Sequence, residues 1–399
     1  MMRKNKTCYC EVGFLMEFIN SHPTVLEPND EIIRLMGNWI SMYQFICKAD
    51  VVLDISSAEF SKLKEESEWM RMFWKKSSNG ECKIEFVGKS KFPYVNKLSY
   101  DKCSIRELNA VYLTIQPDNI CTRLSTELGV VVLNNNLVKD CAHLFRDNGT
   151  EFPSEKAKDW DFLKHLNKVF PSINICNSMI IVDNYLFSDD VKNEDNEKVK
   201  YNLLPILKTL LPNSLAEGEI FEIAVFTGED KEQSFEIQLN YFRSFITKIR
   251  PNLDVKICFY GKAQKEFHDR AILTNNVWMS SGHGFDIFGR SKDVGKPTTI
   301  NIAFPFVQNK LLWCDGSYLN VISQADFISN KRLNKPNLNY WGDIERTNRI
   351  IQYYKEDSKE SEDTKENTSP DFSERVFKPN MKIDLTKIPG YNQWGRKRF

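Results

Sequence analysis

The sequence has no long apolar run, and this absence bears on where the protein works. No run approaches the roughly 20 apolar residues that a membrane-spanning helix needs. The basic start, Met1 to Lys6, is not followed by the apolar segment of a signal peptide. We therefore expect a soluble, cytoplasmic protein without integral membrane association.

An excess of charge of one sign is also missing. Lys and Arg total 54 residues and Asp and Glu also total 54, so the formal net charge is +0. A chain without a global basic field does not attract nucleic acid or membranes nonspecifically. Any anion-binding site must therefore be local.

Paired cysteines are absent too. The chain has 10 cysteines but no Cys-x-x-Cys pair, and most of them lie in apolar runs such as Ile257-Cys258-Phe259. This usage is typical of reduced, buried thiols in a cytosolic protein. A structural zinc site needs paired ligands at short spacing, and only Cys8-x-Cys10 comes near one. No structural metal is expected.

Several catalytic signatures are missing as well. The sequence contains no glycine-rich dinucleotide fingerprint, no Walker A sequence and no Gly-x-Ser-x-Gly turn. Functions that depend on NAD, on ATP or on a serine-hydrolase nucleophile therefore lack support.

What the chain does contain is enough apolar surface for large cores. Hydrophobic residues make up 41% and aromatic residues 12% of its 399 residues. This composition excludes global disorder. The length suits two α/β domains and a tail.

Residues 1–140 alternate between apolar strands and amphipathic helices. Strands are expected at the start of 7–19, at 51–55, within 111–115 and at 130–133, and helices at 30–47, 56–73 and 120–128. Continuously apolar strands that alternate with helices predict a parallel sheet covered on both faces. The polar, turn-rich stretch 134–158 is the expected domain boundary.

A second alternating unit is expected over 155–350. Its predicted helices lie at 160–170, 203–211 and 234–249. One predicted strand ends at Val182, and the others lie at 220–227, 254–260, 267–273, 278–280 and 298–306. The charged, apolar-poor segment 355–376 predicts a disordered linker. Residues 377–399 regain aromatic side chains and are expected to dock on a protein partner or on the chain's own domain.

The segment that begins at His268 holds the most informative constellation. On a strand, His268 and Arg270 share one face. Arg offers planar, bidentate hydrogen bonds to phosphate, and His offers a nucleophile, an acid or a donor. A turn at Gly282 lets the backbone approach an anion. Together these residues predict a phosphate site.

The spacing His268-x-Arg270-(x4)-Asn275-(x6)-Gly282-His283 resembles that of the phospholipase D superfamily, which carries His-x-Lys-(x4)-Asp-(x6)-Gly-Ser. Over about residues 160–310, the chain is more similar still to the phospholipase D-like domain found C-terminal to MIT (microtubule-interacting and trafficking) modules. The resemblance implies a phospholipase D-like α/β fold. It also implies a catalytic His268 and a substrate bound by Arg270, Asn275, Gly282 and His283.

Departures from the family pattern change the expected chemistry. Arg270 in place of Lys keeps phosphate binding, whereas Asn275 in place of Asp removes a carboxylate that orients the histidine. The active family pairs two such motifs, and among the five histidines of this chain only His268 begins one. Phosphate recognition, phosphodiester hydrolysis and a purely structural strand all stay open.

Acidic residues near the N-terminus suggest a second chemistry. A metal-dependent nuclease gathers carboxylates at the carboxyl ends of parallel strands. The candidates are Glu11, Glu59, Glu107 and Asp118. Solvated acids on an ordinary doubly wound sheet are the alternative interpretation.

The run Leu113–Asp118, the helix after it and Gly129-Val130-Val131-Val132 resemble the closing half of a PIN-type ribonuclease domain. The resemblance covers residues 7–135 and implies a PIN-like parallel sheet. It also implies Mg²⁺ or Mn²⁺ held by Glu11, Glu59 and Asp118, with Glu11 and Asp118 catalytic.

Two functions from different classes follow. The first is a nucleic-acid-processing effector, a nuclease (phosphodiesterase) of the bacterial antiviral-defence or toxin type that binds RNA or DNA. The second is a non-enzymatic adaptor that binds phosphate groups of nucleic acid or lipid and docks a protein partner through its C-terminal segment.

A single phospholipase D-type motif can complete its site only by pairing with a second copy. If His268 is catalytic, we expect a homodimer in light scattering and metal-independent cleavage of nucleic acid that His268→Ala abolishes. A monomer that cleaves through His268 would contradict this expectation.

Overall fold

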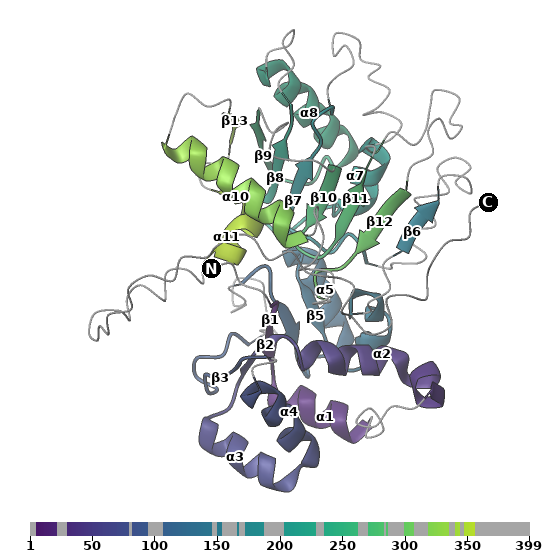
Figure 1. Ribbon diagram of the computed structural model, residues 1–399, viewed down its shortest axis with the longest axis vertical. Helices are drawn as coiled ribbons and strands as arrows, with labels where there is room; N and C mark the ends of the chain where they lie inside the picture. Colours follow the sequence, from purple (N-terminus) through teal and green to yellow (C-terminus); the bar gives the residue numbers. More distant parts are fainter. Residues whose placement is uncertain are drawn as a thin grey trace, which may run out of the picture. The chain divides into compact units, whose positions relative to one another are not determined.

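The computed structural model in Figure 1 describes residues 5–21, 30–79, 82–94, 107–145, 150–153, 166, 172–186, 203–228, 235–261, 270–282, 285, 299–306, 318–334, 340–343 and 347–355. Residues Met1–Ser358 group into one compact unit. Apart from Lys355, the predicted linker 355–376 and the docking segment 377–399 lie outside the described residues. So does most of the predicted helix 160–170.

The first sheet is parallel throughout, as the apolar pattern predicts. Its strands are β1 (Thr7–Cys10), β2 (Asp50–Leu53), β3 (Ile84–Phe86), β4 (Val111–Leu113) and β5 (Val131–Leu133). They are arranged in the order β3-β2-β1-β4-β5. This is the order of a doubly wound sheet, in which the direction of winding reverses between β1 and β4.

Helices pack on both faces of the first sheet. They are α1 (Val12–Ser21), α2 (Asp30–Ile46), α3 (Ser57–Glu66), α4 (Glu68–Ser78) and α5 (Asp118–Leu128). Successive side chains of β4 point to opposite faces: Val111 and Leu113 join the core with α1, α2 and α4, whereas Tyr112 packs with α5. The predicted helix 56–73 is divided at Ser67, whose hydroxyl accepts from the Met70 N–H and caps α4.

The second sheet is mixed and has the order β13-β9-β8-β7-β10-β11-β12-β6. Its strands are β6 (Thr150–Pro153), β7 (Ser178–Val182), β8 (Phe221–Phe226), β9 (Val255–Tyr260), β10 (Arg270–Thr274), β11 (Trp278–Ser281), β12 (Thr299–Ala303) and β13 (Tyr340–Gly342). Strands β7, β8 and β9 are parallel, and the other pairs are antiparallel. The predicted strands β7 to β12 are confirmed. The edge strands β6 and β13 lack a strong apolar pattern and were not predicted.

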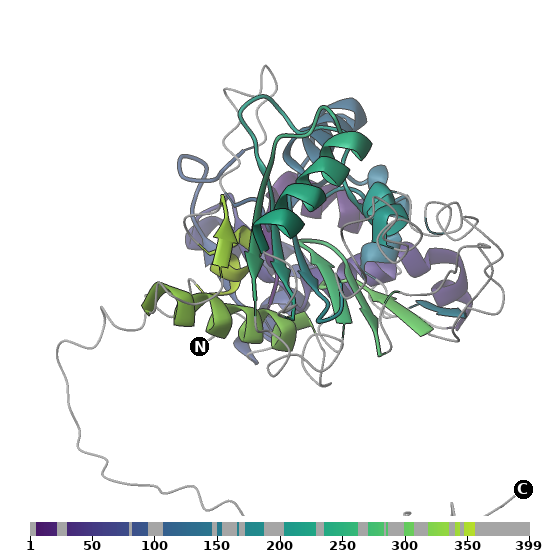
Figure 2. The ribbon, with the colours of Figure 1, turned by 90° about the horizontal axis from the view of Figure 1, so that it is seen from above.

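Helices cover this sheet on both faces too. They are α7 (Leu204–Leu210), α8 (Phe235–Ile249), α10 (Tyr318–Asn334) and α11 (Arg349–Lys355). Ile223 and Val225 of β8 face the core shared with α8, whereas Ala224 and Phe226 face α10 and α11. Figure 2 shows α8 and α10 on opposite sides of the strands. In the part of the chain that the structure describes, no helix is both long and apolar enough to cross a membrane.

The predicted boundary stretch 134–158 contributes to the packing over its described residues. It contains the 3₁₀ turns η3 (Leu137–Lys139) and η4 (Ala142–Phe145), followed by β6. The ring of Phe145 lies 4.8 Å from that of Phe45 in α2 and 5.3 Å from that of Phe306, which follows β12. Because this stretch packs against elements of both sheets, the contacts do not mark it as a separating linker.

Two buried asparagines join the sheets through their amide groups. Asn177 Nδ2 donates to the carbonyls of Leu108 (2.7 Å) and Gly129 (3.1 Å), and the Asn177 N–H donates to Asn275 Oδ1 (3.0 Å). Asn275 Nδ2 also donates to the Gly129 carbonyl, at 3.0 Å. These side chains supply partners for the carbonyls at the end of α5 and before β4, as buried backbone groups require.

Gly129 is the least replaceable residue of this junction. Its φ is +62°, and a Cβ would lie 2.2 Å from the Cys176 carbonyl oxygen. We expect Gly129→Ala to lower the free energy of unfolding by more than about 2 kcal/mol, because a left-handed backbone alone costs about 1–2 kcal/mol for a residue with a Cβ. Urea denaturation measures the change.

Gly218→Ala is the matched control for this substitution. Gly218 also has a positive φ, +86°, but a Cβ at this position would meet nothing within 4 Å. Gly218→Ala should therefore lower the free energy of unfolding only by the cost of the left-handed backbone. Equal losses at the two glycines would contradict the close approach of Gly129 to Cys176.

Candidate functional site

The strands of the first sheet all end at one edge, and polar residues follow them there. Glu11 comes directly after β1, Asp54 after β2 and Thr114 after β4. Strand β1 lies between β2 and β4, beside the reversal of winding where ligands bind in doubly wound sheets. The topology therefore brings these three side chains to the usual ligand position of such a sheet.

Glu11 is only 4% exposed, and neutral donors hold its carboxylate. The Thr114 hydroxyl donates to Oε1 (2.7 Å), and the Ile115 N–H donates to Oε2 (3.1 Å). The Glu11 N–H donates to the Leu113 carbonyl at 2.9 Å, which extends the pairing of β1 with β4. The predicted catalytic Glu11 thus has a fixed orientation at the edge of the sheet.

Asp54 is held in the same way. The Val12 N–H donates to Oδ1 (2.7 Å), and the Tyr94 hydroxyl donates to Oδ2 (2.6 Å). Sequence reasoning did not select Asp54 as a candidate. A signal was present, because Asp54 directly ends the apolar strand Val51–Leu53, and side chains that follow parallel strands gather at one edge.

The charges of these carboxylates act on neighbouring groups. Burial raises the pKa of the Cys10 thiol well above its ordinary value, and contacts with Cys8 and the charges of Asp54 and Glu11 raise it further. Burial, and then the hydrogen bond to Asp54, raises the pKa of Tyr94. At physiological pH, Cys10 is therefore a neutral thiol and Tyr94 a neutral hydroxyl donor.

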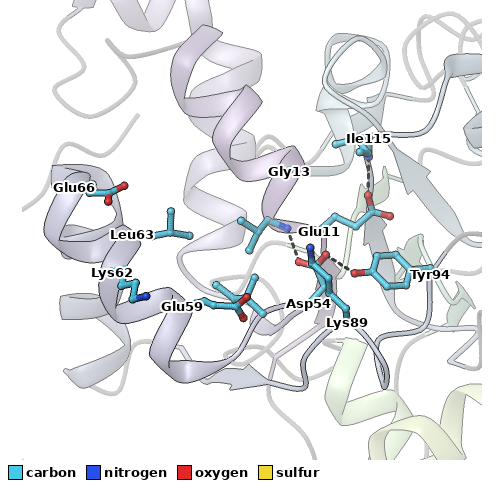
Figure 3. Close-up of a pocket in the computed structure, with 12 residues that line it drawn as sticks. Glu11, Gly13, Asp54, Glu59, Lys62, Leu63, Glu66, Lys89, Tyr94 and Ile115 are labelled. Carbon is cyan, nitrogen blue, oxygen red and sulfur yellow. Dashed lines mark hydrogen bonds between the residues drawn. The ribbon is translucent and has the colours of Figure 1, made fainter.

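Glu11 and Asp54 line an open pocket of about 630 Å³ (Figure 3). Lys62 of α3 and Lys89 of the loop after β3 bring positive charge to it. Ile115, 57% exposed, adds apolar surface. We call this cavity the Glu11–Asp54 pocket. It combines buried carboxylates with exposed ammonium groups and an apolar contact surface.

Glu59 lines the same pocket but has a structural role at the start of α3. Its Oε2 accepts hydrogen bonds from the N–H and the hydroxyl of Ser56, both at 2.8 Å, and the Ser56 hydroxyl accepts from the Glu59 N–H at 3.2 Å. These bonds lower the pKa of Glu59. Ser56 and Glu59 thus form a reciprocal capping box at the start of α3.

Asp118 is the first residue of α5 and is not among the residues that line the pocket. Its Oδ1 accepts from Asn134 Nδ2 (2.6 Å) and Asn136 Nδ2 (3.2 Å), and these bonds lower its pKa. Burial, followed by the charges of Asp118 and Glu11, raises the pKa of the Cys121 thiol to about 12. The charges of Asp118 and Glu11 therefore both act on the Cys121 thiol.

The predicted metal ligands do not form one cluster. Across the residues described above, no three or more His, Cys, Asp or Glu side chains gather so as to hold a metal ion. Glu59 caps α3, and Asp118 accepts hydrogen bonds from two asparagines and lies outside the pocket. The carboxylates that line the pocket are Glu11 and Asp54, which follow β1 and β2, and Glu59 and Glu66 of α3.

A second polar site lies at the start of β10, next to the end of β7. Arg270 donates through one guanidinium nitrogen to the Gly282 carbonyl at 2.7 Å, in an exposed position. The Arg270 guanidinium carbon lies 5.1 Å from the centre of the Tyr185 ring, and Tyr185 is 46% exposed. An exposed guanidinium stacked on an aromatic ring is well suited to contact an anion.

Asn275 does not belong to this second site. It lies in the turn after β10, is 0% exposed, and its amide is engaged in the junction with Asn177 and Gly129. In this structure, Asn275 Oδ1 accepts from the Asn177 N–H and Asn275 Nδ2 donates to the Gly129 carbonyl, so the amide supports the contact between the sheets, and its role as a phosphate ligand stays a prediction. The candidate residues His268 and His283 lie outside the described residues.

The comparisons with known proteins identify no relative. No protein-family model matches the chain, and no curated protein matches its sequence.

Substitutions should separate the roles of Asn275 and Arg270. Asn275→Ala removes a buried amide and is expected to lower the free energy of unfolding by about 1–3 kcal/mol, with no change in anion affinity. Arg270→Ala removes an exposed cation and should change stability by less than about 0.5 kcal/mol, while it weakens phosphate binding. Thermal denaturation measures the stability of each variant, and calorimetric titration with inorganic phosphate measures its affinity. If Asn275→Ala weakened phosphate binding and Arg270→Ala did not, Asn275 would be a phosphate ligand.

Proposed function

We propose that this chain is a nucleic-acid-processing nuclease whose active centre is the Glu11–Asp54 pocket. One observation carries the proposal: buried carboxylates follow the neighbouring parallel strands β1 and β2 and line one open pocket. A carboxylate pair at this edge of a parallel sheet is the arrangement that divalent-metal phosphodiesterases use. The proposal keeps the PIN-like interpretation of residues 7–135 but replaces Glu59 with Asp54.

The donor set of the pocket fits a hard divalent cation such as Mg²⁺ or Mn²⁺. Mg²⁺ is commonly held by one or two carboxylates, together with water and substrate phosphates. Each carboxylate offers about four lone-pair sites, so carboxylates that accept two hydrogen bonds can also coordinate a cation. When bound, the ion would activate water and polarise the phosphate.

The chain's own residues orient these ligands and attract the substrate. Thr114 and Ile115 hold Glu11, and Val12 and Tyr94 hold Asp54. These four donors are neutral groups, and their hydrogen bonds orient the two carboxylates. Lys62 and Lys89 supply positive charge to the pocket, which favours the approach of a phosphate backbone.

The biological setting is part of the proposal. A nuclease pocket joined to a second sheet that carries an exposed Arg270–Tyr185 pair suits an effector of bacterial defence or of a toxin system. In such an effector, the second sheet would recognise phosphate and the first would cut nucleic acid.

The test is cleavage of end-labelled RNA and DNA in Mn²⁺, Mg²⁺ or EDTA. We expect metal-dependent cleavage, and Glu11→Gln and Asp54→Asn should each lower the rate at least about 100-fold, the scale of losing a catalytic group. Asp50→Asn is the control, because Asp50 lies at the opposite end of β2 and accepts from Asn5 Nδ2 at 3.0 Å.

Asp118→Asn separates this proposal from the set predicted by sequence. Its effect should be smaller than that of Asp54→Asn, because Asp118 lies outside the pocket. Cleavage that survives both Glu11→Gln and Asp54→Asn, or that needs no metal, would reject the pocket as the active centre.

A second candidate function is a non-enzymatic adaptor that binds phosphate groups of nucleic acid or lipid. The observation that favours it is the exposed Arg270 guanidinium stacked on Tyr185. The adaptor is the better account if no cleavage is found under any metal condition and Arg270→Ala abolishes anion binding.

A further inference from the structure

We propose that Tyr94 is a positioning residue of the Glu11–Asp54 pocket and sets its affinity for a divalent cation by fixing the Asp54 carboxylate. The inference rests on the proposed function. Tyr94 was not among the candidates that the sequence suggested, and its hydroxyl donates to Asp54 Oδ2 at 2.6 Å.

The backbone alone does not fix the Asp54 side chain. Asp54 follows the last residue of β2, and its two side-chain torsions leave the plane of the carboxylate free to turn. The Val12 N–H holds Oδ1 at 2.7 Å, and the Tyr94 hydroxyl holds Oδ2. With one donor on each oxygen, a single orientation of the carboxylate is selected.

The Glu11 carboxylate is held in a similar way. A fixed carboxylate orientation is therefore a property of the pocket and not of Asp54 alone. Glu11 also accepts from one hydroxyl, that of Thr114, and from one backbone N–H, that of Ile115. Among the contacts that the structure describes, each carboxylate therefore accepts from one hydroxyl and from one backbone N–H. Figure 3 shows Tyr94 and Ile115 on the side of the pocket where these carboxylates lie.

The position of the Tyr94 ring is set by a column of aromatic rings that begins inside the sheet. Tyr112 of β4 stacks on Tyr9 of β1 with 5.0 Å between ring centres, and Tyr9 meets Phe92 edge-on at 6.1 Å. Phe92, 7% exposed, contacts Tyr94 at 4.9 Å. The column connects the loop after β3 to strands β1 and β4, and these contacts restrict the position of the Tyr94 ring.

A hydroxyl outside the inner ligand shell matters because ordered ligands bind a cation without first losing torsional freedom. Losing such an outer partner typically costs about 10- to 100-fold in metal affinity. Tyr94→Phe keeps the ring and removes only the donor. It should therefore leave the aromatic column in place and release Asp54 Oδ2.

The experiment is a titration of the full chain with Mn²⁺, in which electron paramagnetic resonance measures the free ion. We expect the wild-type chain to bind Mn²⁺, Asp54→Asn to lose that binding, and Tyr94→Phe to bind at least about tenfold more weakly. Tyr9→Phe is the matched control: it removes a tyrosine hydroxyl from the same column, bonded to Glu107 Oε2 at 2.9 Å outside the pocket. It should bind Mn²⁺ like the wild-type chain.

The outcomes separate this inference from the proposed function. If Tyr94→Phe binds Mn²⁺ as tightly as the wild-type chain, or if Tyr9→Phe weakens binding equally, Tyr94 is not a positioning residue. Mn²⁺ binding that depends on Tyr94 without any cleavage would uphold Tyr94 and reject the nuclease. A wild-type chain that binds no Mn²⁺ would overturn both.

Discussion

The parallel pairing of β1 with both β2 and β4 is the constraint on which the first site depends. Cys10 lies opposite Leu53 on one side and Leu113 on the other. Glu11 and Asp54, the next residues along the chain, therefore lie at the same edge of the first sheet. Parallel strands end together, whereas an antiparallel neighbour would have carried one of these carboxylates to the opposite edge.

The same strand pairing explains how the pocket holds charged carboxylates in fixed orientations. Backbone N–H groups at the first turn of α1 and after β4 have no partner within their own elements, and they donate to Asp54 and Glu11. The hydroxyls of Tyr94 and Thr114 complete each set. Burial of charge is costly unless hydrogen bonds compensate it, and these four donors contribute to that compensation.

The contact between the two sheets also depends on residues that lie far apart in the chain, namely Asn177 and Asn275, whose amides hydrogen-bond there. Asn275 occupies the position at which the phospholipase D pattern has an aspartate, yet its amide joins Asn177 and Gly129. A carboxylate there would have no proton to donate to the Gly129 carbonyl. Asn275 therefore has a structural explanation in this chain, because its amide supports the contact between the sheets.

Most of the individual elements could be predicted because their signals are local. Apolar runs such as Val130–Leu133 and Met179–Val182 identify strands, and Ser56 with Glu59 identifies the start of α3. The edge strands β3, β6 and β13 could not be predicted, since an edge strand with solvent on one side needs little apolar character. Of the predicted acids, Glu11 and Glu59 line the pocket and Asp118 lies outside it, whereas Asp54, which also lines the pocket, was overlooked.

The sequence by itself determined the α/β class, the parallel character of the first sheet and the presence of acids after its strands. Only the tertiary structure decided which acids meet, because strand order and register are set by packing between segments that lie far apart in the chain. Tyr94 and Asp54 are 40 residues apart, and Asn177 and Asn275 are 98 apart. No local pattern encodes contacts across such separations, so the partners of each side chain emerge only when the sheets are assembled.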